Sequence, residues 1–519
     1  MLTLRREESP ARPLPPDTTA RHPGFHTLER EDAPRTAILR IDDAARLLDP
    51  AARRELTDVL TDLARRRRRP AVEIVGIERG DDLVLAATLA LFVHFKSARI
   101  PVTIVVSPET LSPELLERFE RGLAKPALLL KILEQATFAR LHYLIGEGDD
   151  AGVEAFAPRL PFVELIGDGD PALCRRLARS LDLHKRNLQL MTTRRCHLRC
   201  VYCPVEKRDE DLGREHALRG LGLLLASDNS SFRIDFTGGE PLLRKEWVRA
   251  VIETAHERAL QAGKRDSYYL VTNALELDEE FCRFLSGFEV ELEISIDGAE
   301  ATHNRNKVVV DPGVNPYRAL LGNLEHVHRH DIHYNAVLVF TPDSLPALRG
   351  NLDHVLSLGF RNISINYAIG YLWPDELIAE YVDVLVDFVE RYDMLDSAEG
   401  GDAGAGFFLK NLLHKTEPTV LNSELMLDCD GSLHLLSEWQ FRERHRRRPP
   451  PFRYALEELT SIDEVFFTRA QVYHLLYEVY RAEDRELLRI IHSSVHMGLE
   501  VSRRLKRRLG ARLEALQRC

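Results

Sequence analysis

The chain is predicted to be an α/β protein built around a partial (β/α)6, TIM-like barrel, with an α/β domain before the barrel and a mainly helical cap after it. Three observations support this prediction. Short apolar segments alternate with helical patterns twice along the 519 residues, which is typical of parallel sheets with crossover helices. The length corresponds to about three domains of roughly 150 residues each. With 44% hydrophobic and 29% charged residues, the composition is that of a folded globular protein.

The first alternating series follows a polar segment that contains several prolines. Residues 1–35 are predicted to be a disordered tail, because they contain too little apolar pattern to fold. Residues 36–182 are predicted to form the N-terminal α/β domain. Its expected strands are 36–42, 71–77 and 102–107, and its expected helices are 50–69 and 81–98. The domain lacks a glycine-rich phosphate loop, and two roles stay open for it: binding of a peptide leader or partner protein, or packing on the barrel as scaffold.

The second series, residues 183–375, predicts the barrel. Its expected strands are 188–193, 232–237, 267–272, 290–296, 333–340 and 361–367. A helical stretch follows each of the first five, for instance around 246–260 and 344–358. Parallel strands joined by right-handed crossovers bring their carboxyl ends, and the loops that carry the chemistry, to one end of a barrel. Functional residues are therefore expected directly after each strand.

Residues 376–519 are predicted to form the C-terminal cap. A helix is expected over 375–394, and a glycine-rich hinge follows at 396–406. The last part of the chain has an amphipathic helical pattern.

The charge and hydropathy of the chain exclude several classes of protein. The net charge of −11 predicts that the protein does not bind nucleic acid. Two basic tracts, 65–69 and 442–448, are interpreted as solvated ends of helices and loops, with contact to phosphate or an acidic peptide as the alternative. The sequence contains neither a run of about 18 apolar residues nor the hydrophobic core of a signal peptide. We therefore expect a cytoplasmic protein that does not enter a membrane.

Three of the 7 cysteines lie directly after the first predicted barrel strand. Cys196, Cys200 and Cys203 have the spacing C-x3-C-x2-C, which lets one short loop turn three thiolates towards one metal centre. A [4Fe–4S] cluster usually takes four cysteines, so three would leave one iron open to a small molecule. A structural zinc would need a fourth ligand, which His197, between two of the cysteines, is badly aimed to supply. Spacing alone favours iron–sulfur and leaves zinc and inert cysteines as alternatives.

The stretch LMTTRRCHLRCVYC, residues 190–203, resembles the signature of radical S-adenosylmethionine (radical SAM) enzymes. It is most similar to the peptide-modifying group that includes the anaerobic sulfatase-maturating enzymes and the SPASM and twitch-domain proteins. The resemblance implies that Cys196, Cys200 and Cys203 ligate a [4Fe–4S] cluster whose open iron chelates the amino and carboxylate groups of S-adenosylmethionine. Tyr202 matches the aromatic position beside the adenine, and a loop aromatic packed on the barrel rim is the alternative.

The second motif, Thr237-Gly-Gly-Glu-Pro241, follows the second predicted strand. Glycines permit a close backbone approach, and a carboxylate accepts hydrogen bonds from an ammonium group. The motif resembles the family's glycine-glycine-glutamate-proline motif, which implies that Gly238, Gly239 and Glu240 hold the methionine amino group. The alternative is a strand-to-helix turn with Glu240 near a helix N-terminus.

Two more motifs follow the third and fourth strands. Val271-Thr-Asn-Ala274 is similar to the family's threonine-asparagine-glycine, which implies that Asn273 contacts the ligand, unless it forms a structural Asx turn. Ile294-Ser-Ile-Asp-Gly298 follows the fourth strand, where the resemblance to the family implies that Ser295 and Asp297 contact the ribose and the methionine carboxylate. The family commonly continues with His-Asp-x-x-Arg, whereas this chain has His303-Asn-Arg-Asn-Lys307. Lys307 is expected to pair with a carboxylate as a point charge.

Residues 425–436 resemble the start of a SPASM or twitch domain, in which additional cysteines bind auxiliary clusters. Cys429 precedes the Asp430-Gly431 turn as a ligand would, but the next cysteine is Cys519. One cysteine does not hold a second cluster, so we predict a degenerate, cluster-free domain. The other cysteines are interpreted as buried or incidental thiols, namely Cys174, Cys282 and Cys519.

Together the motifs predict a radical SAM oxidoreductase or maturase that uses S-adenosylmethionine and a [4Fe–4S] cluster. The resemblance implies reductive cleavage of S-adenosylmethionine to a 5′-deoxyadenosyl radical, which abstracts hydrogen from the substrate. The expected partners are a peptide or protein substrate and a low-potential electron donor such as a flavodoxin or ferredoxin. Two alternatives stay open: a radical SAM enzyme that acts on a small metabolite, and a non-catalytic iron–sulfur protein that senses redox state. The intact GGEP and SIDG motifs count against the second.

Overall fold

The fold is taken from a computed structural model of the chain. It describes five short strands before residue 107, then residues 141–156, 187–392 apart from 228 and 361, 424–435, 453–462, 476 and 479–518. The chain divides into two units, each with its own internal packing. The first consists of Met1–His184 and Asp463–Ala470, and the second of Lys185–Ile462 and Gln471–Cys519.

The first unit contains a five-stranded sheet in the order β1-β2-β3-β4-β5. Its strands are β1 (Ala11–Pro13), β2 (Phe25–Arg30), β3 (Thr36–Ile41), β4 (Arg69–Ile74) and β5 (Thr103–Val106), and α5 (Asp150–Phe156) follows them. β1, β2 and β3 are antiparallel, whereas β3, β4 and β5 are parallel. The three strands predicted here are confirmed as β3, β4 and β5. The predicted helices 50–69 and 81–98 lie outside the described residues.

The disordered tail predicted for residues 1–35 is wrong where β1 and β2 lie. β2 pairs with β3 from Phe25↔Ile41 to Glu29↔Ala37, and β1 pairs with β2. Strand pairing satisfies backbone groups, so it depends less on side-chain hydrophobicity than burial in a core does. A polar composition is therefore a weaker argument against an edge strand than against a helix or a central strand.

The second unit is built on a parallel sheet whose six strands were all predicted from the sequence. They are β6 (Asn187–Thr193), β8 (Ser231–Gly238), β9 (Arg265–Thr272), β10 (Val290–Ser295), β12 (His333–Phe340) and β13 (Ile363–Tyr367). They stand side by side in chain order, and every neighbouring pair is parallel. The predicted α/β fold with a partial-barrel sheet is confirmed.

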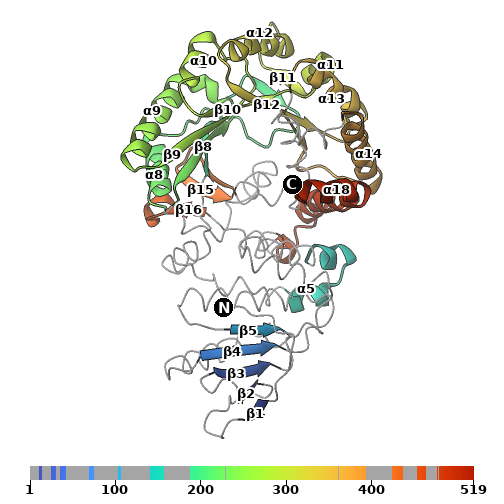
Figure 1. Ribbon diagram of the computed structural model, residues 1–519. Helices are drawn as coiled ribbons and strands as arrows, with labels where there is room; N and C mark the ends of the chain where they lie inside the picture. Colours follow the sequence, from blue (N-terminus) through green and yellow to red (C-terminus); the bar gives the residue numbers. More distant parts are fainter. Residues whose placement is uncertain are drawn as a thin grey trace. The chain divides into compact units, whose positions relative to one another are not determined.

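Helices connect these strands and cover one face of the sheet, as Figure 1 shows. They are α8 (Arg214–Leu225), η5 (Pro241–Arg244), α9 (Lys245–Gln261), α10 (Glu279–Leu285), α11 (Glu300–Asn306), α12 (Pro316–Arg329), η6 (Leu345–Ala347) and α13 (Leu348–Ser357). Asp278 and Asn315 cap α10 and α12 through their side-chain oxygens.

The two faces of the sheet differ in chemistry because side chains alternate along each strand. Leu292 and Ile294 of β10 are fully buried, whereas Glu291, Glu293 and Ser295 between them are half-buried. On β9, Tyr268 faces the helices, since its hydroxyl donates to the Ile252 carbonyl of α9 at 3.1 Å. We call the opposite face, which includes Tyr269, Glu291 and Ser295, the inner face.

The C-terminal region extends the same sheet past β6. Its strands are β14 (Leu425–Leu427), β15 (Ser432–Leu435) and β16 (Arg453–Ala455), and η9 (Leu456–Glu458) follows. β14 is parallel to β6, with Met426 opposite Gln189, and β15 and β16 continue antiparallel. These three strands were not among the elements predicted from the sequence, which were a SPASM- or twitch-like remnant at 425–436 and helices in a mainly helical cap. The predicted hinge at 396–406 lies outside the described residues.

Two long helices complete the second unit. α14 (Asp375–Tyr392) confirms the helix predicted at 375–394, and α18 (Arg485–Arg518) lies along it. Arg504 forms an ion pair with Asp375 at 2.7 Å, and the Tyr367 hydroxyl of β13 donates to the Ser494 carbonyl at 2.9 Å. α18 is therefore anchored both to the last barrel strand and to α14.

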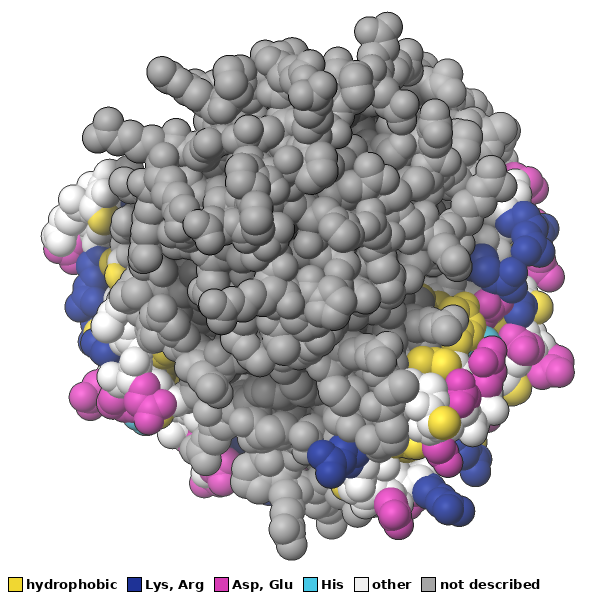
Figure 2. Space-filling view, turned by 90° about the horizontal axis from the view of Figure 1, so that it is seen from below, with side chains coloured by type: hydrophobic (Ala, Val, Ile, Leu, Met, Phe, Trp, Pro, Cys, Tyr) yellow, Lys and Arg dark blue, Asp and Glu magenta, His cyan; other side chains and the backbone are white. Residues whose placement is uncertain are grey.

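On the face drawn in Figure 2, the Lys and Arg side chains of the described residues are interspersed with Asp and Glu, and no large patch of one sign is visible among them. None of the described helices combines the length and the apolar character needed to cross a membrane.

Candidate active site

The three-cysteine loop starts directly after β6, at the carboxyl end of the parallel sheet. Its middle forms a short strand, β7 (Leu198–Cys200), which pairs antiparallel with β11 (Lys307–Val309), so that Lys307 stands opposite Cys200. The Cys203 amide donates to the Cys200 carbonyl at 3.1 Å and closes the turn. The loop is therefore held by backbone hydrogen bonds on both sides of its central cysteine.

Two of the three thiols have hydrogen-bond donors next to them. Cys196 Sγ accepts from the Leu198 amide at 3.3 Å, and the Asn273 side-chain amide lies at 3.8 Å. Lys207 Nζ donates to Cys203 Sγ at 3.2 Å. Such groups stabilise thiolates and set the potential of a cluster bound to them.

Burial and nearby positive charge have opposite effects on the pKa values of two of these thiols. Burial raises the pKa of Cys196 above its usual value and that of Cys200 to about 11. Lys207 opposes the rise of the pKa at Cys196, and Lys307 opposes it at Cys200. Burial therefore disfavours the free thiolate forms of Cys196 and Cys200, and Lys207 and Lys307 reduce this effect.

A buried network joins Tyr202 of this loop to the end of β10. The Tyr202 hydroxyl lies 2.9 Å from both carboxylate oxygens of Asp297. Lys307 Nζ donates to the Tyr202 hydroxyl and to Ser295 Oγ, both at 2.7 Å, and lies 3.5 Å from Asp297 Oδ1. Burial alone would lower the pKa of Lys307, but Asp297 and the Cys200 thiol raise it above its usual value. The expected pairing of Lys307 with a carboxylate is confirmed, and the carboxylate is Asp297.

The two glycines of the GGEP motif pack against the backbone that leads into the cysteine loop. A Cβ atom on Gly239 would lie 1.9 Å from the Arg195 carbonyl oxygen, and one on Gly238 would lie 2.5 Å from the Thr193 carbonyl oxygen. Gly238 also has φ of 136°, a conformation that favours glycine. The observed close approach is therefore to the cysteine loop itself.

Glu240, the third residue of the motif, is fully buried and accepts three hydrogen bonds. Its donors are the Leu242 amide at 3.1 Å, the Thr272 hydroxyl at 2.7 Å and the Asn273 amide at 2.9 Å. Burial raises the pKa of Glu240, and these donors oppose the rise. Glu240 also caps η5, so the turn predicted as the alternative is present and places a carboxylate beside the threonine-asparagine motif.

The Asx turn that was predicted as the alternative role of Asn273 is observed. Its Oδ1 accepts from the Leu275 amide at 3.0 Å, which is an Asx turn, while its Nδ2 faces Cys196 Sγ. The next residue, Ala274, has φ of 63° where the family has glycine. The left-handed turn is thus kept without glycine, at a cost of about 1 kcal/mol.

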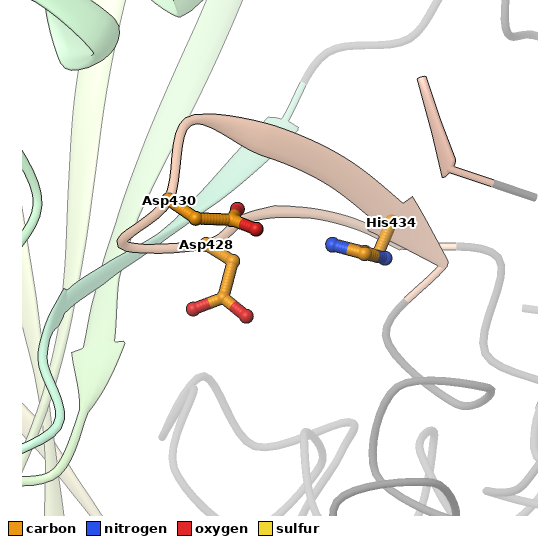
Figure 3. Close-up of side chains that lie close together, drawn as sticks. All are labelled: Asp428, Asp430 and His434. Carbon is orange, nitrogen blue, oxygen red and sulfur yellow. The ribbon is translucent and has the colours of Figure 1, made fainter. Parts of the chain in front are cut away.

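A second group of potential metal ligands lies on the hairpin of β14 and β15. Figure 3 shows Asp428, Asp430 and His434 on this hairpin, and their ligand atoms lie within 4.8 Å of one another. Their hydrogen-bonding capacity is largely used inside the fold. Arg194 pairs with Asp428 at 2.6 Å, and Ser432 Oγ contacts both Asp430 and His434 Nε2. The group is a hydrogen-bonded turn with its own cation, and we assign no metal to it.

Cys429, the cysteine of the same turn, contacts the end of β6. Its Sγ donates to the Met191 carbonyl at 3.2 Å, and its side chain packs with Val205 around Met191 and Met426. Burial raises its pKa to about 12. It therefore behaves as a packed thiol.

The residues present fit a three-cysteine iron–sulfur centre better than zinc. His197, which lies inside the loop, is paired through Nε2 with Glu276 at 3.2 Å and does not complete a tetrahedral set. Beside the loop, Asn306 Nδ2 and His303 Nε2 are buried donors or acceptors without a hydrogen-bond partner in the described part of the chain. Such atoms are what a polar ligand would satisfy.

Sequence reasoning found the cysteines and the motif residues, but it missed two contributors. Lys207 contacts Cys203, and Arg194 connects the start of the loop to Asp428. No signal in the sequence distinguishes these two from the chain's many other basic residues. Lys207 stands four residues after Cys203, and this spacing is the single local indication.

The fold and the site define an α/β partial barrel with a cysteine-lined centre at the carboxyl end of its first strand. Residues 190–345 match the family model described as the Radical SAM superfamily, and the chain therefore contains a radical SAM domain. The resemblance inferred from the motifs is confirmed at this level. Enzymes of this superfamily use a [4Fe–4S] cluster and S-adenosylmethionine.

Curated relatives match parts of the chain. An uncharacterized protein of Methanocaldococcus jannaschii is 26% identical over 185 residues, which are 35% of this chain and 62% of that protein. A GTP 3′,8-cyclase of Corynebacterium glutamicum is 34% identical over 139 residues, 26% of this chain and 36% of the cyclase. The chain therefore spans less than two thirds of the length of these relatives.

Among solved structures, the chain is similar to native anSMEcpe with bound AdoMet. The TM-score is 0.50 at 15% identity, over 64% of this chain and 98% of the other. At this identity the similarity shows the shared fold.

Proposed function

We propose that the protein is a radical SAM enzyme that abstracts hydrogen from a peptide or protein side chain. The observation that carries the proposal is the loop of three half-buried thiols, Cys196, Cys200 and Cys203, at the carboxyl end of β6, surrounded by donors. Bound there, a [4Fe–4S] cluster would supply an electron for reductive cleavage of S-adenosylmethionine to a 5′-deoxyadenosyl radical. The electron would come from a low-potential donor such as a flavodoxin or ferredoxin.

The chain's own residues would bind and orient the cofactor. The three cysteines would hold three irons and leave the fourth to the methionine amino and carboxylate groups. Glu240 accepts from the Asn273 amide, Asn273 Nδ2 lies 3.8 Å from Cys196 Sγ, and Gly238 and Gly239 pack against the backbone that leads into the loop. We assign these four residues to the methionine side of S-adenosylmethionine.

Tyr202, Ser295 and Asp297 would hold the nucleoside side. The network around Lys307 fixes the Tyr202 ring and the Asp297 carboxylate in one arrangement, so that little freedom is lost when a ligand binds. Holding the reacting carbon of the substrate at a fixed distance is the main catalytic contribution of such a site.

The preference for a peptide rests on the similarity of the cysteine motif to peptide-modifying enzymes. A small-metabolite substrate is the second candidate, and the match to GTP 3′,8-cyclase favours it. Redox sensing without catalysis is the third reading and is tested by the same assay.

Anaerobically reconstituted protein, dithionite and S-adenosylmethionine should release 5′-deoxyadenosine, measured by liquid chromatography. Cys200→Ala should abolish release, whereas Cys282→Ala, which changes a buried thiol of α10, should not. Absence of release from the wild type with a fully loaded cluster would contradict the enzyme. Consumption of GTP in place of candidate peptides would favour the metabolite.

A further inference from the structure

Exposed apolar side chains gather on and beside the two-stranded ribbon that β7 and β11 form. In the described part of the chain, seven large apolar side chains are exposed, and five of them lie here. Val201, Val308 and Val310 are 48%, 47% and 57% exposed. A group of exposed apolar side chains marks an interaction site more often than single ones do. We call these five residues the ribbon patch: Val201, Val308, Val310, Val314 and Leu372.

Hydrogen bonds bring the outlying members of the ribbon patch to the ribbon. The Tyr371 hydroxyl donates to the Val201 carbonyl at 3.3 Å, so the adjacent Leu372 lies near the end of β7. Val314 closes the turn that follows Val310, where its amide donates to a turn carbonyl at 3.1 Å. The patch is therefore formed by segments that are far apart in the sequence.

The reverse side of the ribbon carries the central cysteine of the candidate site. Side chains alternate between the two sides of a strand, and directly opposite residues share a side. Lys307 stands opposite Cys200 and is 1% exposed, so this pair is on the buried side. Arg199 and Val308 form the next pair, are both exposed and lie on the outer side. The ribbon patch and the Cys200 side chain are thus on opposite sides of one ribbon.

A partner on the outer side is able to deliver an electron to this site but not an atom. Transfer of an atom needs reacting centres about 3–3.5 Å apart, which the intervening ribbon prevents. An electron tunnels through a thin layer of protein. Packed sheets lie about 10 Å apart, so a redox group held against the patch would be separated from Cys200 by a layer of this order.

The charged residues at the ribbon favour an acidic partner. Arg199 is exposed, and its Nη1 donates to two backbone carbonyls at 2.9 and 3.1 Å. Arg305, two residues before β11, is exposed and forms no ion pair within the described part of the chain. Asp311 is the exposed acidic residue beside them. Two guanidinium groups against one carboxylate make this border positive, although the whole chain has a net charge of −11.

The small extent of the ribbon patch suits a transient partner. A stable interface takes about 20–30 residues from each side, whereas weak electron-transfer complexes bury less than about 1,200 Å² in total. Five apolar residues with a charged border correspond to the second class. A permanent dimer of this chain would need a larger apolar surface.

We propose that the ribbon patch is the docking surface of an acidic one-electron carrier protein, which reduces the cluster through the ribbon. The inference rests on the proposed function, since it concerns the reduction of the same site. The carrier loses one electron, the [4Fe–4S] cluster gains it and passes from the 2+ to the 1+ state, and no bond forms or breaks in this step.

The test uses the full-length chain with a reconstituted cluster, and flavodoxin is the probe. In the reaction its anionic flavin hydroquinone becomes the neutral semiquinone, so no proton is transferred. Stopped-flow absorbance under anaerobic conditions follows the reduction of the cluster. Isothermal titration calorimetry measures the binding of oxidised flavodoxin.

Val308→Glu places a negative charge in the ribbon patch. It should lower both the affinity for flavodoxin and the rate of reduction about tenfold, because a carboxylate would be desolvated against an acidic partner. Leu260→Glu is the matched control, since it changes an apolar residue of α9 that is 66% exposed. It should change neither quantity.

Arg305→Glu tests the charged border separately. It should slow the reduction severalfold at low ionic strength, and the difference should disappear at about 1 M salt, where the Debye length is about 3 Å. Arg265→Glu, at an exposed residue that begins β9, is the control and should have little effect.

Three results would overturn the proposal. The first is absence of flavodoxin binding to the wild type. The second is an equal rate of reduction in the wild type, Val308→Glu and Arg305→Glu. The third is a dimer of the wild type in sedimentation experiments that Val308→Glu dissociates, because a second copy of the chain would then occupy the patch.

Reduction by dithionite separates this outcome from that of the proposed function, since dithionite needs no docking surface. With dithionite, Val308→Glu should release as much 5′-deoxyadenosine as the wild type. Absence of release from the wild type would remove the proposed function, while flavodoxin binding and cluster reduction would still test the patch. Loss of release in Val308→Glu alone would show damage to the site, and Arg305→Glu would then decide.

Discussion

Two turns beside strand β6 each carry cysteine, and they use it differently. The three-cysteine loop has thiols whose neighbours are donors: the Leu198 amide, the Asn273 amide group and Lys207. The β14–β15 turn has one thiol that donates to a backbone carbonyl. Its carboxylates already have Arg194 and Ser432 as partners.

The comparison shows that ligand-type residues form a binding site only when their surroundings leave ligand atoms available. Donors around a thiol stabilise its metal-binding form, whereas a thiol that donates inside a core has no such support. The presence of Asp428, Asp430 and His434 close together is therefore a weaker indication of a metal than three cysteines among donors.

The largest effect is expected from replacing one cysteine in each turn, which tests whether only the three-cysteine loop binds iron. Cys196→Ser should reduce the iron bound after anaerobic reconstitution from about four per chain to a small fraction, because two thiolates do not retain a cluster of this type. Cys429→Ser should leave the iron content unchanged. Iron is measured colorimetrically with the cluster's visible absorbance. A wild-type value near eight would contradict the predicted absence of an auxiliary cluster.

The ion pair of the β14–β15 turn can be broken separately. Arg194 and Asp428 are 5% and 8% exposed, so Arg194→Met leaves a buried carboxylate uncompensated. We expect a loss of about 3–5 kcal/mol in the free energy of unfolding, measured in urea. The double variant Arg194→Met/Asp428→Leu should recover most of it. Equal losses in the single and double variants would contradict a role for the charge pair.

The packing of the GGEP glycines against the three-cysteine loop can be tested by adding a Cβ atom. Gly239→Ala would bring a Cβ atom to 1.9 Å from the Arg195 carbonyl, and we expect a loss of about 1–3 kcal/mol in unfolding free energy. Gly222→Ala is the control, since a Cβ atom at this position of α8 meets nothing within 4 Å. It should stabilise the protein by about 0.5–1 kcal/mol. Destabilisation by both changes would show that the effect is not specific to the loop.

Lys307 distinguishes the cysteine loop electrostatically from the other turn. Lys307→Met removes a buried positive charge opposite Cys200, so it should disfavour the reduced cluster and lower its potential. We expect a shift of about 59 mV, a tenfold change for one electron, in a titration followed by electron paramagnetic resonance. Lys307→Arg should restore the potential. Lys207→Met, at a half-buried residue, should shift it less.

The smallest expected effect is a pH dependence from His303, which accepts from the Asp297 amide at 3.4 Å. Burial, helped by Lys307, lowers its pKa to about 2. Its contribution to stability is therefore present above the unfolded pKa of about 6.5 and is lost as pH falls below it, by about 1.36 kcal/mol per unit. His303→Asn should remove this slope from urea unfolding curves between pH 7.5 and 5.5. An unchanged slope would mean that His303 is not the group responsible.

Much of the barrel could be predicted from the sequence. The six parallel strands were predicted within two residues at each end, since each is a short apolar run that alternates with a helix. The strands β14 to β16 were not anticipated, because three or four residues carry too little periodicity, and because β14 is a strand through its pairing with β6. β1, with three residues, was missed for the same reason, and the six-residue β2 was missed because the segment around it is polar and contains too little apolar pattern.

The candidate site also contains features that the sequence predicts and contacts that only the structure shows. The spacing of Cys196, Cys200 and Cys203 and the motifs around Glu240, Asn273 and Asp297 are local features of the chain, so the sequence by itself determined the radical SAM domain and the cofactors of its family. Only the tertiary structure decided which groups surround them. Lys307 meets Tyr202, Arg194 meets Asp428, and Asn335 meets Tyr269 across distances of 66 to 234 residues in the chain. The physical reason is that a short spacing is encoded in one contiguous segment, whereas these contacts arise from the register between strands and the closure of long loops.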